Sequence, residues 1–380
     1  MIHGSRVKQA RELRGIKSGS LADSLGISPG RLTQIERDGV IAGAITPELL
    51  SAHLLMPPAF FSTPIPEELS DGSMRFRARK TTKADLALVR RRAEVAHELA
   101  HHLVRFVNPP ASRVPALPAG DIEEAAQQTR AALSIAPDAV IPNVVHALER
   151  AGVFVYAVEP IESGKIDAFT TWTGPALERP IMAIAATGSW DRLRLTAAHE
   201  LGHLVMHRAS AHLPELANDV EGEADRFAGA FLMPRDAALE EIPRGFTLNQ
   251  LFPLKERWGM SLGALVWRAF EVGVIDLERR RGLHQQIGVR GWRTREPGWD
   301  ARPPERPRAL RKMFELAYGP QFDIARVAGM MHRYATDLQR DLARYAGAPS
   351  RTRPSRATTT MPATDEPREM PNNVVQLRRR

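Results

Sequence analysis

Apolar positions along the chain recur mainly at the three- and four-residue spacing of amphipathic helices. This pattern predicts one long helix over residues 83–107 and shorter helices over 122–133 and 142–151. Helical spacing also dominates residues 196–274 and returns over 308–345, after a proline-rich connector. The chain is therefore predicted to be mainly helical.

Three short runs have the alternation or the apolar character of strands instead: residues 74–77, 153–158 and 181–185. A few strands among many helices predict an α+β fold, mainly α with a small β-sheet. We expect the run at 181–185 to present a sheet edge, which could pair with an extended substrate backbone.

The stretch His199-Glu200-Leu201-Gly202-His203 places two imidazoles four residues apart on a predicted helix. Residues at this spacing share a helix face, so His199 and His203 can bind one metal ion. Glu200 is turned by about 100° from His199, beside the ion, where a general base would sit. Gly202 costs the helix about 1 kcal/mol relative to Ala, which makes sense if another backbone packs closely against it.

Acidic residues that could complete such a site follow on a second predicted helix. Glu221 and Asp225 are four residues apart and share a face there. We expect Glu221 to be the third ligand and Asp225 to orient a ligand histidine through its other ring nitrogen. Glu223 is the competing ligand, and the apolar residues around it favour Glu221. Three protein ligands leave the fourth position of a Zn²⁺ ion open, as in catalytic zinc sites.

A second copy of the motif, His97-Glu98-Leu99-Ala100-His101, shows that the pattern also arises by chance. It follows three consecutive arginines, among which a divalent cation would be disfavoured. Glu123 and Glu124 lie downstream of it, but neither is followed by a carboxylate four residues later. We therefore expect this copy to be a helix surface with a few half-buried histidines.

Residues 191–234, which contain the motif at 199–203 and the candidate acids, resemble the ImmA/IrrE metallopeptidases. The resemblance extends back through Val153-Phe154-Val155-Tyr156 and forward to Gly291-Trp292-Arg293. In all it covers most of residues 120–296. It implies a zincin-like metallopeptidase domain in this part of the chain.

By the same resemblance, the zinc ligands are His199, His203 and Glu221, and the base is Glu200. Members of the family that are proteolytic cleave repressor-type regulators, and some are stress-response switches. Other members have not been shown to cleave a protein, so the fold alone does not settle activity.

The first 61 residues predict a compact group of short helices. One helix ends at Gly26, and Ser28 can cap the next helix, with Pro29 at its first position. Leu32 and Ile35 of that helix would face a small core. A short turn between two such helices is helix-turn-helix geometry. The side chains expected to contact DNA are Ser28, Arg31, Thr33 and Gln34.

Residues 6–61 resemble an XRE-type helix-turn-helix domain, which implies DNA binding and transcriptional regulation. The chain departs from that family at two places. Ser18-Gly19 stand where the family often has a glutamine that contacts phosphate, and Gly30 provides no side chain to read a base. A helical module for protein contacts is therefore the alternative.

The charge of the chain favours a nucleic-acid partner without requiring one. The positive net charge of +8 is concentrated in residues 75–92, 279–312 and 378–380. Such basic stretches attract nucleic acid without reading its sequence, although arginine-rich solvated faces are also common. The chain has no cysteine, which excludes disulfides and thiol chemistry, so a metal would have to be bound by His, Asp or Glu.

The sequence has no apolar run of 18 residues and no signal-peptide core at its start. We therefore expect a cytoplasmic protein that does not associate with membranes.

These patterns divide the 380 residues into five expected segments. They are a helix-turn-helix domain over 1–62, a basic connector with a strand and a long helix over 63–119, the metallopeptidase domain over 120–296, a Pro/Arg connector with a helical segment over 297–346, and a disordered tail over 347–380.

The leading hypothesis is a transcriptional regulator with a zinc-dependent endopeptidase domain that cleaves a repressor or antitoxin-like protein. The alternative is a DNA-binding transcription factor whose metal domain senses without cutting. A third and weaker hypothesis is an antitoxin-like binding protein. The expected cofactor is Zn²⁺, and the expected partners are DNA, a protein substrate and a second copy of the chain.

Overall fold

The computed structural model confirms a mainly helical chain with a small β-sheet. It describes all residues except 1, 39–44, 67–68, 70–74, 79–81, 119, 161–165, 175–177, 186–188, 209–218, 347–374 and 377–380. The described residues form 17 α-helices and six strands. Within that part of the chain, no helix combines the length and the apolar character needed to cross a membrane.

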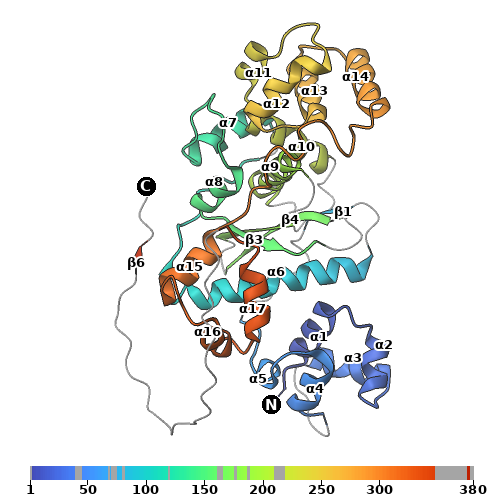
Figure 1. Ribbon diagram of the computed structural model, residues 1–380, viewed down its shortest axis with the longest axis vertical. Helices are drawn as coiled ribbons and strands as arrows, with labels where there is room; N and C mark the ends of the chain where they lie inside the picture. Colours follow the sequence, from blue (N-terminus) through green and yellow to red (C-terminus); the bar gives the residue numbers. More distant parts are fainter. Residues whose placement is uncertain are drawn as a thin grey trace. The chain divides into compact units, whose positions relative to one another are not determined.

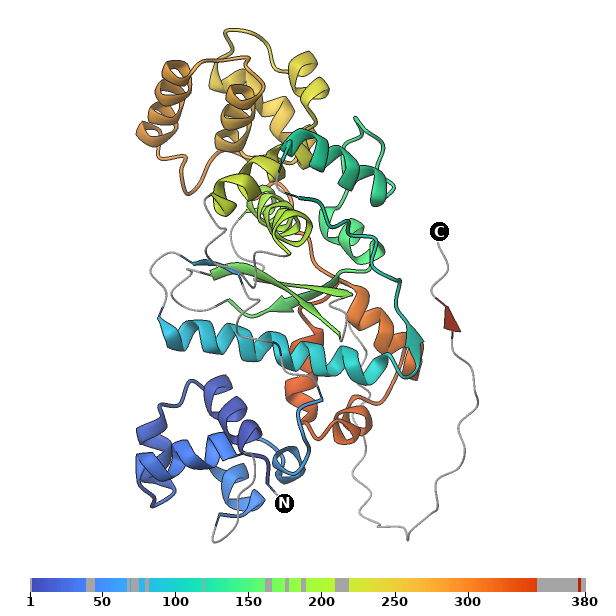
Figure 2. The same cartoon turned by 180° about the vertical axis from the view of Figure 1, so that it is seen from behind.

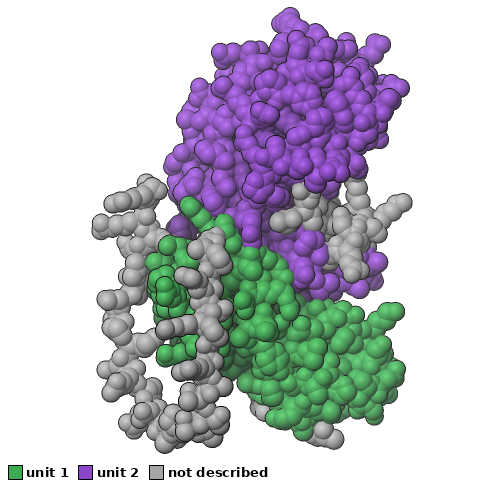
Figure 3. All heavy atoms as spheres, in the orientation of Figure 1, with its two compact units in different colours: residues 1–67, 95–109, 308–380 green, residues 68–94, 110–307 purple. Residues whose placement is uncertain are grey.

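The chain divides into two compact units, each assembled from separate stretches of sequence (Figure 3). Unit 1 contains residues 1–67, 95–109 and 308–380, and unit 2 contains residues 68–94 and 110–307. The five segments expected from the sequence stay a prediction. The predicted disordered tail lies outside the described residues, apart from the two residues of β6 (Val375–Gln376).

Unit 1 is almost entirely helical. Its helices are α1 (Gly4–Leu13), α2 (Ser18–Ser24), α3 (Pro29–Asp38), α4 (Pro47–Leu54), α5 (Pro58–Phe61), the second half of α6 (Lys83–Leu103), α15 (Ala309–Tyr318), α16 (Ile324–Met330) and α17 (Ala335–Leu342). β2 (Val107–Asn108) pairs in parallel with β6.

The first five helices enclose a small apolar core of their own. Leu32 and Ile35 of α3 are buried in it, as their spacing predicts. Ser28 begins α3, because its Oγ accepts a hydrogen bond of 3.2 Å from the backbone N–H of Arg31. The buried guanidinium of Arg6 on α1 forms an ion pair of 2.6 Å with Glu98 of α6.

Unit 2 combines the sheet with the remaining helices. They are the first half of α6, α7 (Ile122–Ala132), α8 (Val144–Arg150), α9 (Trp190–Met206), α10 (Val220–Leu232), α11 (Arg235–Glu241), the 3₁₀ helix η3 (Leu248–Leu251), α12 (Phe252–Trp258), α13 (Leu262–Glu271) and α14 (Leu277–Val289).

The sheet of unit 2 contains β1 (Arg75–Ala78), β3 (Phe154–Val158), β4 (Ile166–Thr173) and β5 (Arg179–Ala185) in the spatial order β1-β4-β5-β3. β3 runs parallel to β5, whereas β4 runs antiparallel to β5 and to β1. β5 is therefore an interior strand, and the expectation that residues 181–185 form a sheet edge is wrong. β4, which is not among the strands expected from the sequence, pairs with one side of β5, and β3 pairs with the other.

The helix α9 lies on this sheet, against β4 and β5, and α10 lies alongside α9 (Figures 1 and 2). A Cβ atom added to Gly202 of α9 would lie 3.1 Å from Cδ1 of Phe227 and 3.3 Å from Cα of Ala224, both on α10. The glycine therefore allows the two helices to approach closely, as its place in the motif predicts. This contact determines where the side chains of α10 stand relative to those of α9.

Replacing Gly202 by Val should force α10 away from α9, because the added atoms would overlap Phe227 and the α10 backbone. We expect a loss of about 1–3 kcal/mol in unfolding free energy, measured by chemical denaturation. Gly282→Val on α14 is the matched control, since a Cβ there meets nothing within 4 Å. Equal losses in the two variants would show that helix propensity sets the effect and packing does not.

Candidate metal centre

Two buried imidazoles of α9 form the base of the candidate site. His199 and His203 are four residues apart and therefore project from one face of the helix. Their side chains are 0% and 3% exposed, and their Nε2 atoms lie 3.1 Å apart. Both rings thus direct the same nitrogen toward one point.

The carboxylate of Glu221, from the first turn of α10, bridges the two rings. Its Oε2 lies 3.4 Å from Nε2 of His199, and its Oε1 lies 3.3 Å from Nε2 of His203. The ligand atoms of these three residues lie within 4.8 Å of one another. No other group of three or more His, Asp or Glu residues in the described part of the chain is placed to hold a metal ion.

Asp225, one turn further along α10, binds the far side of the first imidazole. Its Oδ1 lies 2.8 Å from Nδ1 of His199, which is the contact that the sequence predicts for it. A carboxylate accepts here, so Nδ1 of His199 carries the proton and donates it. The lone pair of Nε2 is then directed at the cluster.

The second imidazole is held by a longer chain of contacts that ends at Glu223. Nδ1 of His203 lies 2.9 Å from Nδ1 of His207, and Nε2 of His207 lies 2.8 Å from Oε2 of Glu223. Because the carboxylate accepts, His207 carries its proton on Nε2 and accepts on Nδ1 from His203. His203 therefore also has an unprotonated Nε2. Of the two candidate ligands on α10, Glu221 joins the pair of histidines and Glu223 binds His207.

The charge states of His203 and Glu221 suit a bound cation. Burial lowers the pKa of His203 to about 4, so its ring is neutral at pH 7. The close contacts with His199 and His203 hold the pKa of Glu221 far below its usual range, so its carboxylate is ionised. Two neutral imidazoles and one carboxylate are a donor set that Zn²⁺ accepts, with room for a fourth ligand. The residues present therefore fit a zinc ion.

Glu200 follows His199 on α9, and its side chain is fully buried. The hydroxyl of Thr170, on β4, donates a hydrogen bond of 3.1 Å to its Oε2. The hydrogen bond from Thr170 to Glu200 is not expected from the sequence, because β4 is not among the predicted strands. The run Phe169-Thr170-Thr171-Trp172-Thr173 could have revealed the strand, since aromatic and β-branched residues are enriched in strands.

The other copy of the motif has a structural role on α6. Glu98 is bound by Arg6 and by the amide of Gln9, at 2.6 and 2.7 Å. His97 is buried, and His101 is exposed. The residues expected to contact DNA are at or near the start of α3, in unit 1, and all are exposed: Ser28, Arg31, Thr33 and Gln34.

Removing His207 should weaken zinc binding, because His203 would lose the partner that fixes its ring and its tautomer. We expect His207→Ala and the isosteric Glu223→Gln each to raise the zinc dissociation constant by about 10- to 100-fold, measured by competition with a chromogenic chelator. Glu240→Gln, which removes an exposed carboxylate on α11, is the control and should bind zinc like the wild type. If His207→Ala and Glu223→Gln both bind zinc with unchanged affinity, the contacts of His207 and Glu223 do not orient His203.

Comparison with known proteins found a family match for part of the chain. A search of curated proteins found no match. Residues 148–270 match the Peptidase_M78 family model, described as the IrrE N-terminal-like domain. The matched range is narrower than the 120–296 expected from the sequence. It nevertheless contains the three residues of the cluster and the residues that contact its histidines, Asp225, His207 and Glu223. The chain therefore carries an IrrE N-terminal-like domain of the Peptidase_M78 family, and its candidate metal centre lies inside that domain.

Proposed function

We propose that this domain is a zinc-dependent endopeptidase within a regulatory protein. The observation that carries the proposal is the convergence of His199, His203 and Glu221. The buried Glu200 follows His199 directly in the sequence. Each ligand histidine is oriented by a carboxylate through its other ring nitrogen, directly or through His207. Such supported histidines are typical of metal sites with a defined geometry.

Zinc bound by these three residues would supply Lewis-acid activation of a water molecule and of the scissile carbonyl. Glu200 supplies the proton chemistry. Its carboxylate accepts a proton from the attacking water, and the new C–O bond forms at the peptide carbonyl carbon. The same carboxyl group then donates that proton to the amide nitrogen as the C–N bond breaks. The hydrogen bond from Thr170 limits the rotation of Glu200 and keeps it beside the metal-binding face.

The proposed substrate is a repressor or antitoxin-like protein. Support for this class comes from the family resemblance, whose proteolytic members cleave such regulators. The N-terminal helices support a regulatory setting, because unit 1 presents an exposed polar face on α3.

A Glu200→Gln variant separates metal binding from proton transfer. It keeps the size of the side chain and should retain zinc, while the rate of peptide cleavage should fall by about 10²-fold or more. Cleavage is measured with a proteome-derived peptide library, in which each new amino terminus is labelled and identified. Glu240→Gln again serves as the surface control and should cleave like the wild type.

Two results would count against the endopeptidase. If Glu200→Gln yields the same new amino termini as the wild type, Glu200 is not the base. If the zinc-loaded wild type yields none, the metal domain is better explained as a sensor that binds without cutting.

We further propose that the N-terminal helices bind DNA, with Ser28, Arg31, Thr33 and Gln34 as the contacting residues. Support comes from their exposure around the start of α3 and from the burial of Leu32 and Ile35 on the opposite side. Arg31 and Gln34 also bind each other at 2.8 Å, so their polar groups lie together on the surface. Helix-turn-helix modules commonly act as dimers on paired half-sites, which would require a second copy of the chain.

An Arg31→Ala substitution should weaken DNA binding and should lower the slope of log affinity against log salt by about 1, because one phosphate contact is lost. The affinity is measured by fluorescence anisotropy with fragments selected from genomic DNA. Lys8→Ala, which removes an exposed charge from α1, is the control. Equal effects of the two substitutions would indicate attraction by net charge alone and would contradict recognition by α3.

A further inference from the structure

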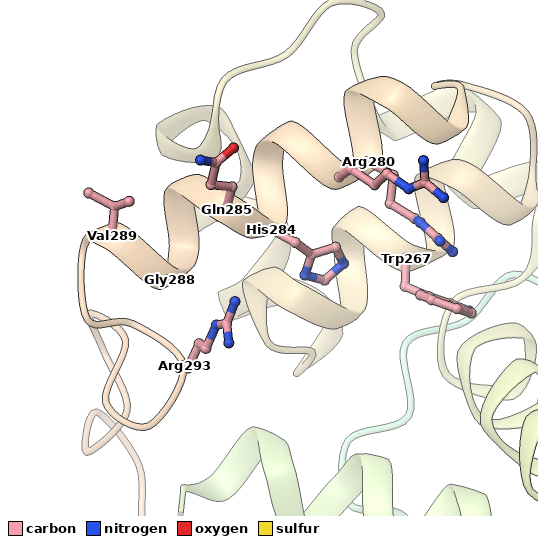
Figure 4. Close-up of a pocket in the computed structure, with 8 residues that line it drawn as sticks. Trp267, Arg280, His284, Gln285, Gly288, Val289 and Arg293 are labelled. Atoms are coloured by element: carbon pink, nitrogen blue, oxygen red, sulfur yellow. The ribbon is translucent and has the colours of Figure 1, made fainter.

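A hollow between α13 and α14, in unit 2, is lined by positively charged side chains (Figure 4). None of the residues that line it carries a carboxylate. Its cationic side chains are those of Arg280, Arg281 and Arg293, and its aromatic side chain is that of Trp267. The nearby acid, Glu271, is already bound by the indole N–H of Trp267 at 2.8 Å. Mutual repulsion of three guanidinium groups is unfavourable unless an anion lies among them.

Two of these arginines are fixed by packing. The guanidinium of Arg280 lies 4.3 Å from the ring centroids of Trp267 and Phe270, within the range of cation–π contacts. Arg293 lies across the backbone of α14 at Gly288, where an added Cβ would come within 3.0 Å of its Nε. Fixed guanidinium groups lose little freedom when a ligand binds.

His284, which also lines this hollow, has a ring nitrogen without a hydrogen-bond partner. That nitrogen, Nε2, is buried. Its ring packs near Gly263 in the first turn of α13, with Cε1 3.8 Å from the position of a Cβ there. Burial, and then the charges of Arg280 and Arg293, lower the pKa of His284. A buried polar atom without a partner is costly, and a ligand that reaches it would satisfy it.

We propose that this hollow binds a small molecule that carries a phosphate group. Arginine guanidinium groups match phosphate oxygens in pairs, and a neutral imidazole can donate a third hydrogen bond. These groups line one hollow beside α14, and we therefore choose a compact phosphate ligand over a nucleic-acid backbone as the occupant. The site is separate from the residues of the candidate metal centre and does not depend on peptidase activity.

The test is calorimetric titration of the full chain with inorganic pyrophosphate at constant ionic strength. Arg293→Gln should raise the dissociation constant about tenfold, the effect of one charge-assisted hydrogen bond. Arg290→Gln is the matched control: it removes one exposed charge at the end of the same helix, outside the hollow, and should change the constant less than twofold. In the wild type, the imidazole resonances of His284 should shift as pyrophosphate binds.

Four results would overturn the proposal. Equal weakening by Arg293→Gln and Arg290→Gln would show attraction by general charge. If Arg293→Gln does not change the dissociation constant, pyrophosphate binds elsewhere on the chain. If pyrophosphate does not bind at all, the hollow is not a phosphate site. If pyrophosphate and adenosine monophosphate do not bind, but duplex DNA binds and Arg293→Gln weakens that binding, the hollow is a nucleic-acid contact.

Discussion

The close contact between α9 and α10 at Gly202 is the constraint on which the candidate metal centre depends. A Cβ atom at Gly202 would crowd Ala224 and Phe227, so the glycine lets α10 lie close to the histidines of α9. The acids that surround Ala224 in sequence then reach those histidines at 2.8–3.4 Å, either directly or through His207. A helix displaced by one ångström would break contacts of this length.

One helix terminus supplies the three carboxylates that contact the histidines. Glu221, Glu223 and Asp225 lie in the first two turns of α10, where the helix dipole stabilises carboxylates. Glu221 contacts Nε2 of both histidines. Asp225 accepts the hydrogen bond of His199 and Glu223 that of His207, so the protons lie on the nitrogens that face away from Glu221. The division of roles follows from the helix period, because Glu221 and Asp225 are almost one turn apart and Glu223 is turned aside by about 200° from each. The two buried rings and one ionised carboxylate then form a donor set that suits a cation.

The sequence predicted the parts of this site that depend on local geometry. The spacing of His199 and His203 and the shared face of Glu221 and Asp225 follow from the helix period alone. The need for a close neighbour at Gly202 follows from helix propensity. Long-range pairings were not predictable in this way. The run of residues that forms β4 lacks strict alternation, so neither the interior place of β5 nor the contact from Thr170 to Glu200 could be read from periodicity. The link from His203 through His207 to Glu223 joins residues 20 apart, and it appears only when α9 and α10 are packed.

The most direct test of the central claim is an anomalous-diffraction map of crystals of the full chain grown with zinc. The account predicts one peak per chain, about 2.0–2.2 Å from Nε2 of His199, Nε2 of His203 and a carboxylate oxygen of Glu221. Glu223 should remain bound to His207 in that map. A peak coordinated by Glu223 in place of Glu221, or no peak near the two histidines, would contradict it.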